Sequence, residues 1–513
     1  MTGKAVQPPG MARLKSGIAG LDSILRGGFL TGGNYLIMGP PGVGKTILGN
    51  QLCFHHIAAG GRAIYLSLLA ETSSRLLDQL QSFTFYTPDP VGDALYYLSG
   101  YAVLEREGLE GLLNMIRGET RSRRATLLVI DGSAVAKFST SVQDWTRFLH
   151  ALYVSAEITR CTTVLLMQSY QDSASLSPEQ TVVEGLIELA MPTFGMRVAR
   201  ELRVRKFRGS DFLEGSHLYT ITREGIVVHP RTEALLAPAP VELPATAPEQ
   251  MSRMSVGIPR LDEMLQGGFP SGSITLLVGT SGTGKTLLGS HFLLTGAAQG
   301  KPGLYFGFNE TPLRLARQMT RFGFDVSRAR AEGLLEVLWQ SPVQDNLDVL
   351  AERLLAAIER RGVRLLFIDG LAGFQRTVAS AERLDLFLAT LFTHLQALEI
   401  TTICSMELPT LFSPTVELPA ISRGATDLVD NMLFLRYVEL ESQLYRLISI
   451  IKMRESGYDA AIREFRITDR GIDVAPTFTS AQAILTGVAR PAATVISSPP
   501  FAAEPARAQG GQP

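Results

Sequence analysis

A chain of 513 residues is too long for one hydrophobic core, so we expect roughly two to four domains. Its 48 basic residues balance 49 acidic ones, which argues against nucleic acid or anionic lipid as the main partner. Three widely separated cysteines offer no disulfide framework, and no apolar run approaches the ~18 residues of a membrane span. The N-terminus has no apolar signal-peptide core, so we expect a cytoplasmic protein without a membrane partner.

The chain repeats itself over a long period. Residues 16–46 and 256–286 share one pattern, and their lysines Lys45 and Lys285 lie 285 − 45 = 240 positions apart. This period indicates a duplicated domain rather than a solenoid unit. Segments outside the repeats are rich in Ala and Pro without periodicity, which is typical of linkers and disordered ends. We predict a disordered N-terminus at 1–13, a first domain at 14–230, a linker at 231–253, a second domain at 254–478 and a disordered tail at 479–513.

Each half alternates short apolar runs with amphipathic helical stretches such as 109–116 and 350–359. Near-continuous apolar strands separated by helices are typical of a parallel sheet that is covered on both faces. The predicted fold class is therefore α/β in each half. The predicted strands lie at 34–39, 63–69, 126–132 and 162–168 in the first half and at 273–279, 303–308, 364–370 and 401–406 in the second.

Both halves carry G-x-x-x-x-G-K-T directly after a predicted strand. Glycines let backbone N–H groups point at phosphate oxygens, and the following helix adds its positive N-terminal end. The lysine reaches the β- and γ-phosphates. A glycine-rich turn that binds nothing is the alternative, and the second match at the same place in the repeat argues against it. The predicted nucleotide-binding residues are Gly39, Gly42, Val43, Gly44, Lys45 and Thr46, and Gly279, Gly282, Thr283, Gly284, Lys285 and Thr286.

Four residues are candidates for holding Mg²⁺. Thr46 and Thr286 carry the motif hydroxyl, and Asp131 and Asp369 end apolar strands 131 − 45 = 86 and 369 − 285 = 84 residues beyond the loop lysines. A carboxylate at such a strand end faces the shell of a metal bound at the loop. The alternative for each aspartate is a cap on the helix that follows.

The chain resembles the KaiC family of two-domain RecA-type clock ATPases. The resemblance rests on the lead-in G-I-x-x-L-D-x-x-L-x-G-G-F, the two phosphate-binding loops and K-x-R-x-S at 206–210 and 452–456, and it covers roughly 14–478. It implies two tandem RecA-like P-loop NTPase domains, each a mostly parallel sheet flanked by helices. It also implies a homo-hexameric ring that binds ATP and Mg²⁺ between subunits, hydrolyses ATP slowly and serves as a nucleotide-state switch in signalling or timing, with regulatory proteins that the sequence does not identify.

The resemblance gives the K-x-R elements a catalytic role. Lys206 and Arg208, like Lys452 and Arg454, would reach the γ-phosphate held by the next subunit. A fixed cation there acts as an arginine finger, because negative charge develops on the phosphate oxygens in the transition state. A solvated basic strand end is the alternative for each pair.

The sequence departs from the family at the catalytic base. The family carries two adjacent glutamates after its second strand, the first acting as base, whereas this chain reads Ala70–Glu71 and Asn309–Glu310. Neither alanine nor asparagine can accept a proton, so hydrolysis relies on Glu71 and Glu310 or is slower. The two glutamates could equally be surface residues at a helix start. Gln168 and Glu407, which end a later strand, are further candidates for positioning water.

The second departure concerns Ser/Thr autophosphorylation. The family's neighbouring Ser–Thr acceptor pair aligns with Thr426 and Asp427, so Thr426 is the phosphorylation candidate. The alternative is an ordinary N-cap before the next apolar stretch.

Two other functions are alternatives to the nucleotide-state switch. One is a RecA-type DNA recombination or repair ATPase, against which the near-zero net charge argues. The other is an ATP-dependent assembly scaffold with little catalysis.

Overall fold

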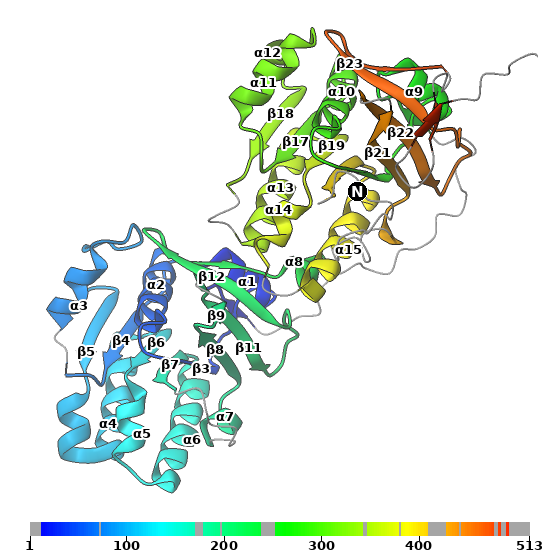
Figure 1. Cartoon of the computed structure of the whole chain (residues 1–513). Coiled ribbons are helices and arrows are strands. Elements are labelled where there is room, and N and C mark those ends of the chain that lie inside the picture. The colour runs from blue at the N-terminus through cyan, green and yellow to red at the C-terminus, as the bar shows by residue number, and fades with distance from the viewer. Residues whose placement is uncertain are drawn as a thin grey trace, which may run out of the picture. The chain divides into compact units, whose positions relative to one another are not determined.

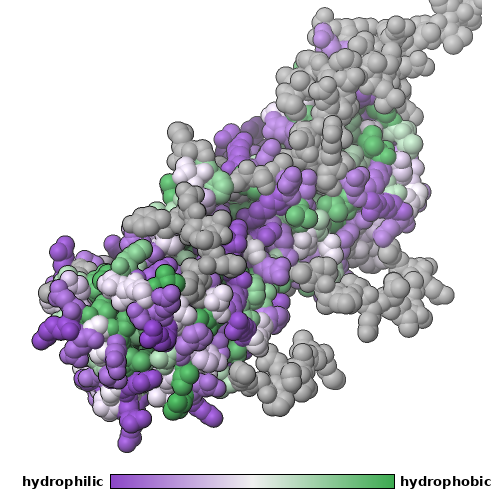
Figure 2. All heavy atoms as spheres, turned by 90° about the horizontal axis from the view of Figure 1, so that it is seen from below, coloured by the Kyte–Doolittle hydropathy of each residue, from purple (hydrophilic) through white to green (hydrophobic). Residues whose placement is uncertain are grey.

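The computed structural model describes most of the chain, which falls into two compact units (Figure 1). The described residues are 12–70, 73–169, 178–194, 197–236, 252–341, 346–378, 381–408, 427–440, 443–476, 481–483 and 489–491. Within those ranges we find no helix that combines the length and the apolar character required for a membrane span. On the face drawn in Figure 2, hydrophilic residues dominate the described surface and apolar side chains are interspersed among them.

The first unit contains a nine-stranded sheet in the order β13-β12-β11-β8-β3-β7-β6-β4-β5. The strands from β8 to β5 are parallel to one another, and β11, β12 and β13 continue the sheet in antiparallel fashion. Their bounds are β3 Asn34–Gly39, β4 Ala63–Ser67, β5 Leu95–Ser99, β6 Leu127–Asp131, β7 Thr162–Gln168, β8 Gly185–Ala190, β11 Glu201–Phe207, β12 Ser216–Thr222 and β13 Gly225–His229.

The second unit repeats this sheet, in the order β24-β23-β22-β21-β16-β20-β19-β17-β18. Its strands from β21 to β18 are parallel, and the remaining three are antiparallel. The predicted α/β fold with mostly parallel sheets is therefore confirmed in both units. The bounds are β16 Ile274–Gly279, β17 Gly303–Gly307, β18 Leu335–Trp339, β19 Leu365–Asp369, β20 Thr401–Glu407, β21 Asn431–Leu440, β22 Gln443–Met453, β23 Arg463–Thr468 and β24 Gly471–Val474.

Helices connect the parallel strands, and short two-stranded ribbons lie outside the main sheets. The helices of the first unit are α1 Ala19–Ile24, α2 Lys45–Ala58, α3 Ser73–Leu80, α4 Tyr101–Arg123, α5 Ser133–Phe138, α6 Val142–Thr159, α7 Pro178–Val182 and α8 Thr232–Leu235. Those of the second are α9 Pro259–Met264, α10 Lys285–Ala298, α11 Pro312–Arg321, α12 Val326–Ala331, α14 Ala372–Gln375 and α15 Ala381–Ala397. Helix α13 Leu347–Arg361 belongs to the first unit up to Arg353 and to the second from Leu354. The ribbon strands are β1 Arg13–Leu14, β2 Phe29–Leu30, β9 Thr193–Phe194, β10 Arg197–Val198, β14 Arg253–Met254, β15 Phe269–Pro270, β25 Ala481–Ala483 and β26 Ala489–Pro491.

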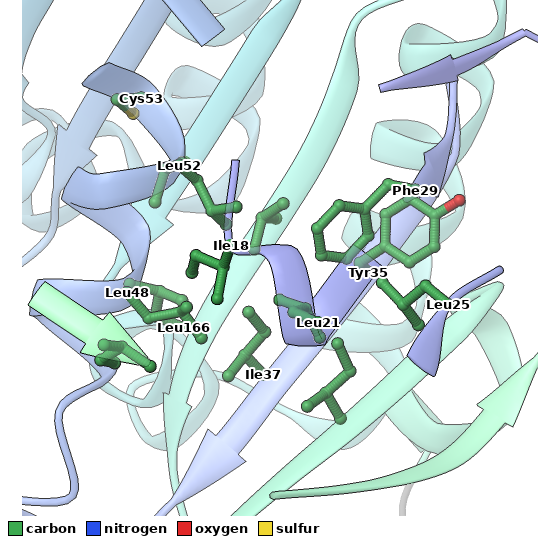
Figure 3. Packing of buried hydrophobic residues seen from close by; sticks show 14 of the residues in the cluster. Ile18, Leu21, Leu25, Phe29, Tyr35, Ile37, Leu48, Leu52, Cys53 and Leu166 are labelled. Atoms are coloured by element: carbon green, nitrogen blue, oxygen red, sulfur yellow. The ribbon is translucent and has the colours of Figure 1, made fainter. Parts of the chain in front are cut away.

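Apolar side chains cover both faces of the first sheet. Ile37 of β3 packs in a cluster with Leu48 and Leu52 of α2 (Figure 3), whereas its neighbour Leu36 packs in a second cluster with Trp145 of α6. Successive residues of a strand point to opposite faces, so a strand buried on both sides needs a continuous apolar run. Each fully buried aliphatic side chain contributes about 1.5–3 kcal/mol, and the clusters therefore fix where β3 ends and its loop begins.

The last hairpin of each sheet, β12–β13 or β23–β24, is hydrogen-bonded to the helix that follows the phosphate-binding loop. In the first unit, Gln51 of α2 accepts a hydrogen bond from the Ile226 amide at 2.7 Å. At the same place in the repeat (51 − 45 = 6, 291 − 285 = 6), His291 accepts one from the Ile472 amide through Nε2 at 3.3 Å. Only a neutral imidazole can accept in this way. Burial lowers the pKa of His291 to about 4.

We predict that His291 makes the second unit acid-sensitive. Its pKa lies below the ordinary 6.5, so between pH 6.5 and 4 the unfolded chain binds more protons than the folded one. The free energy of unfolding should therefore fall as the pH decreases through this window, by roughly 3 kcal/mol in total. The variant His291→Gln carries at this position the glutamine that the first unit has at Gln51. Its free energy of unfolding should fall less than that of the parent when the pH is lowered. Urea unfolding at pH 7 and pH 4.5, followed by Trp339 fluorescence in a Trp145→Phe background, measures this difference.

The matched control is Gln51→His, which should introduce the same acid sensitivity into the first unit. Unfolding of that unit is followed by Trp145 fluorescence in a Trp339→Phe background. Other histidines titrate equally in parent and variant, so they cancel in the comparison. Equal losses of stability in parent and His291→Gln would show that His291 is not responsible.

Candidate functional site

The phosphate-binding loop of each unit connects a strand of the parallel sheet to the helix that follows. In the first unit β3 ends at Gly39 and α2 begins at Lys45. Gly44 has φ 103°, and a Cβ there would lie 2.9 Å from Cδ1 of Ile221, so only glycine fits. A Cβ on Gly42 would meet no atom within 4 Å, so this side of the loop is open. The loop thus leaves room for a phosphate beside its backbone, as a nucleotide site requires.

The loop lysines lie against carbonyls of their own loops. Lys45 Nζ donates to the carbonyl oxygens of Gly39 and Pro40, both at 2.8 Å. Lys285 Nζ donates to those of Gly279 at 2.8 Å and Thr280 at 2.7 Å. Burial lowers the pKa of both ammonium groups, and the Asp131 carboxylate opposes this for Lys45, as Glu407 and then Asp369 do for Lys285. Each loop therefore holds a partly desolvated cation at a fixed point.

A threonine, an aspartate and a tyrosine meet beside each loop. Thr46 Oγ1 donates to Asp131 Oδ2 at 2.8 Å, and the Tyr65 hydroxyl donates to the same oxygen at 2.6 Å. In the second unit Thr286 and Tyr305 donate to Asp369 Oδ2 at 2.8 and 2.7 Å. Both aspartates are buried, at 6% and 5% exposure. The structure thus brings together the threonine and aspartate that the sequence predicted for each half.

These residues fit a magnesium ion. Mg²⁺ prefers oxygen ligands and is usually held by one or two protein oxygens together with substrate phosphates. In each unit a hydroxyl and a carboxylate lie within hydrogen-bond distance of one another beside the loop, and they supply this donor set. Mg²⁺ would be held by Thr46 and Asp131 in the first unit and by Thr286 and Asp369 in the second.

Sequence analysis did not identify the two tyrosines. Burial, followed by the Asp131 carboxylate, raises the pKa of Tyr65 well above its ordinary value, so its hydroxyl stays a donor. Burial and Asp369 raise the pKa of Tyr305 in the same way. The repeat could have identified them, because a tyrosine lies 20 positions after the loop lysine in both halves (65 − 45 and 305 − 285).

The two sites differ in one contact to the aspartate. Ser405 Oγ donates to Asp369 Oδ1 at 2.6 Å, so both oxygens of this carboxylate accept hydrogen bonds. Ser405 pairs with Asp369 in the sheet register, and Leu166 takes the corresponding place beside Asp131. Leu166 belongs to the apolar cluster of the first unit. The Asp369 carboxylate therefore has a hydroxyl partner that Leu166 cannot offer to Asp131.

The K-x-R cations lie at the opposite end of the sheet from the loop of their own unit. Lys206 Nζ donates to the carbonyl oxygens of Gln180 and Thr181 at 2.9 and 3.0 Å, in the segment that precedes β8. Arg208 donates to the Thr181 carbonyl at 3.4 Å. Burial, followed by the Arg208 charge, lowers the pKa of Lys206. Because β8 is parallel to β3, this segment lies at the amino ends of the strands, whereas the loop follows their carboxyl ends.

The second unit repeats this arrangement. Lys452 Nζ donates to the Val429 carbonyl at 2.7 Å, and Arg454 donates to the Asp427 carbonyl. Both acceptors precede β21, which is parallel to β16. Burial, with the neighbouring Arg454 charge as the second cause, lowers the pKa of Lys452.

Comparison with known proteins identifies the family. A family model described as the KaiC ATPase matches residues 14–233 and 254–478. The chain belongs to the KaiC family. The circadian clock oscillator protein KaiC 1 of Synechocystis sp. is 28% identical over 498 residues, which cover 93% of this chain and 92% of that protein. The KaiC proteins of Synechococcus elongatus and Prochlorococcus marinus are 27% identical over 493 and 491 residues, with 93% of this chain covered in both cases and 92% and 95% of the relatives.

Membership of the KaiC family confirms the resemblance predicted from the sequence, and the two sheets match tandem RecA-like domains. It assigns ATP binding and ATPase activity in general to this chain. It does not favour the alternative of a DNA recombination or repair ATPase.

The positions where this chain departs from the KaiC pattern are only partly described. Glu71 and Thr426 lie outside the described residues, and Ala70 is exposed. Glu310 directly precedes Thr311, the N-cap of α11, and pairs with Arg314 at 3.2 Å. Its charge adds to burial and Asp369 in raising the pKa of Tyr305, so Glu310 lies near this tyrosine and its partner Asp369. Both interpretations of Glu310, catalytic base and helix-start residue, fit this position.

The two further candidates for positioning water lie beside the loops. Gln168 ends β7 and pairs with Gly39 in the register, and Glu407 ends β20 and pairs with Gly279. The Glu407 charge acts on the pKa of Lys285, which places its carboxylate close to the second loop. Glu407 therefore lies close to Lys285, at the end of the sheet where the second loop begins.

Proposed function

We propose that this protein is a cytoplasmic ATPase that assembles into a homo-hexameric ring. ATP is bound between neighbouring subunits and hydrolysed slowly there, and the nucleotide state of the ring sets its shape and its regulatory partners in signalling or timing. The observation that carries the proposal is the position of Lys206 and Arg208, and of Lys452 and Arg454, relative to the loop of their own unit.

These cations cannot serve the loop of their own unit. The six residues of β3 separate the two ends of the sheet, and at a rise of about 3.3 Å per residue they span roughly 20 Å. The six residues of β16 do the same in the second unit. A lysine side chain is far shorter than this separation. A second copy of the chain that offers its cation-bearing edge to the loop would complete the site, and a closed ring does so for every subunit.

Each residue has a defined task in such a shared site. The loop amides and Lys45 or Lys285 bind the phosphates of ATP, and the lysine and arginine of the neighbouring subunit stabilise the charge that develops on the transferred group. When bound, Mg²⁺ supplies positive charge that offsets the phosphate oxygens. Glu71 and Glu310 orient the attacking water and accept its proton. Turnover is slow because Ala70 and Asn309 have no basic group where the family carries its first glutamate.

The proposal includes autophosphorylation at Thr426. Only one hydroxyl remains at the position of the family's acceptor pair, and Asp427 carries a permanent negative charge next to it. Incubation with Mg-ATP followed by peptide mass spectrometry should find phosphate on Thr426, and Thr426→Ala is the control. A protein that stays unmodified at this residue would remove the kinase part and leave the ATPase part intact.

Native mass spectrometry with and without Mg-ATP, followed by phosphate release on the same sample, tests the ring. We expect a hexamer that carries nucleotide and turns over slowly. A single chain at saturating Mg-ATP would contradict the proposal. A hexamer that retains ATP without releasing phosphate would support the alternative of an assembly scaffold. Ala70 and Asn309, which stand where the family has its first glutamate, are the reason to consider that alternative.

A further inference from the structure

An ion pair between a half-buried lysine and a buried glutamate joins two short helices of the first unit. Lys137 Nζ of α5 lies 2.5 Å from Glu179 Oε1 of α7, and the Glu179 side chain is only 2% exposed. The indole N–H of Trp145, on α6, donates to the other carboxylate oxygen at 3.3 Å. Figure 1 places α6 next to both helices, in line with their contacts. A buried carboxylate is stable only when it is paired, so Lys137 fixes where Glu179 lies.

The same helix α7 supplies the acceptors for the K-x-R cations. The carbonyls of Gln180 and Thr181, the next two residues after Glu179, accept from Lys206 Nζ at 2.9 and 3.0 Å, and Arg208 donates to the second of them. With five residues, α7 is too short to be stable by itself. Its position therefore depends on the contacts that its side chains make with the rest of the unit.

The other partner of the ion pair, Lys137, lies on the helix that begins two residues after Asp131. Helix α5 begins at Ser133, two residues after Asp131, and Ser133 Oγ donates to the Leu166 carbonyl at 2.8 Å. Ala134 and Ala136 of α5 are buried in the apolar cluster. Lys137 is thus attached to the part of the sheet that holds Asp131, and through Glu179 it connects that part to α7.

We propose that the Lys137–Glu179 ion pair positions Lys206 and Arg208 for the site that they complete in the neighbouring subunit. The pair is a positioning element and takes no part in the chemistry. It fixes the position of α7, and the α7 carbonyls fix the positions of the two cations. Through Lys137, these positions are fixed relative to Asp131. This inference rests on the proposed function, because it requires that the cations act on ATP.

The second unit carries no lysine at the corresponding place. Six residues after the strand-end aspartate (137 − 131 = 6, 375 − 369 = 6) stands Gln375. Its K-x-R cations also donate to backbone carbonyls, those of Val429 and Asp427. At this place the first unit therefore carries a charge and the second an uncharged amide.

A double-mutant cycle in the full-length protein tests the inference. The four proteins are the parent, Lys137→Gln, Lys206→Ala and the double variant, with kcat and KM measured for Mg-ATP by phosphate release. We expect Lys137→Gln to lower the kcat of the first-unit sites about tenfold and to leave KM nearly unchanged, because the phosphate loop is intact. In the Lys206→Ala background the same change should lower kcat much less, because only Arg208 is then left for the ion pair to position.

Two further variants control for unspecific effects. All proteins carry Lys452→Ala and Arg454→Ala, so that first-unit sites dominate turnover. Lys137→Arg keeps the ion pair and should retain activity, and Lys15→Gln removes an exposed lysine of the same unit and should change nothing. If Lys137→Gln fails to assemble, Glu179→Gln, which retains an acceptor for Trp145, takes its place in the cycle.

The outcomes separate this inference from the proposed function. If Lys206→Ala alone leaves kcat unchanged, the proposed function fails and the inference fails with it. If Lys206→Ala lowers kcat but Lys137→Gln does not, or if the two losses multiply in the double variant, the inference is wrong and the proposed function stands. A loss confined to KM would also overturn it, because it would indicate damage to ATP binding.

Discussion

Lys45→Ala together with Lys285→Ala should abolish nucleotide retention. Each ammonium group is held at 2.7–2.8 Å by loop carbonyls and is partly desolvated, so it contacts phosphate with little competition from water. Two of the three N–H donors of each ammonium bind loop carbonyls and the third can donate to phosphate, and one such charge-assisted hydrogen bond contributes about 1.5–3 kcal/mol, or roughly 10–10²-fold in affinity per site. Titration calorimetry with ATP, and the nucleotide content of the purified protein, measure the loss.

The single variants serve as internal controls for this prediction. Lys45→Ala and Lys285→Ala should each retain about half of the nucleotide, because the two loops belong to separate units. Lys15→Ala, which removes an exposed lysine of the first unit, should retain all of it. Circular dichroism must show that the double variant is folded. A folded double variant that binds ATP with parent affinity would show that these loops are not the nucleotide sites.

The features that sequence analysis predicted correctly depend on short-range patterns. A continuous apolar run such as 127–130 predicts a strand buried on both faces, and β6 spans these residues and ends at Asp131. The positions of Thr46 and Asp131 were also predictable, since the carboxyl ends of parallel strands meet at one edge of a sheet, where the structure joins them. Recognition of the KaiC family rested on the same contiguous motifs.

Contacts that depend on strand register or on the rotamer of a remote side chain were not predictable. Ser405 reaches Asp369 only because β20 pairs with β19 in one particular register. The Lys137–Glu179 pair joins residues 42 positions apart on two short helices, and neither helix has an amphipathic pattern that reveals the other. The attachment of Lys206 to α7 likewise follows from the antiparallel return of β11 along β8.

Replacing the K-x-R cations should remove turnover and spare ATP binding. We expect Lys206→Ala, Arg208→Ala, Lys452→Ala and Arg454→Ala together to lower kcat by about 10²–10³-fold or more, because fixed charges stabilise the transition state far more than the bound substrate. ATP affinity should change little, since both loops and their lysines are intact. Phosphate release at saturating ATP, together with calorimetric titration, separates the two effects.

Subunit mixing decides whether these cations act in their own subunit or in the next one. The cation-deficient protein has intact loops, and the Lys45→Ala, Lys285→Ala protein has intact cations. In randomly mixed rings about a quarter of the interfaces combine an intact loop with intact cations from its neighbour, so two inactive proteins should together regain activity. If each chain built its sites alone, every site would lack either the loop lysine or the cations, and mixing the two proteins would restore no activity. A mixture that exchanges subunits by native mass spectrometry and stays as inactive as its components would refute the shared site.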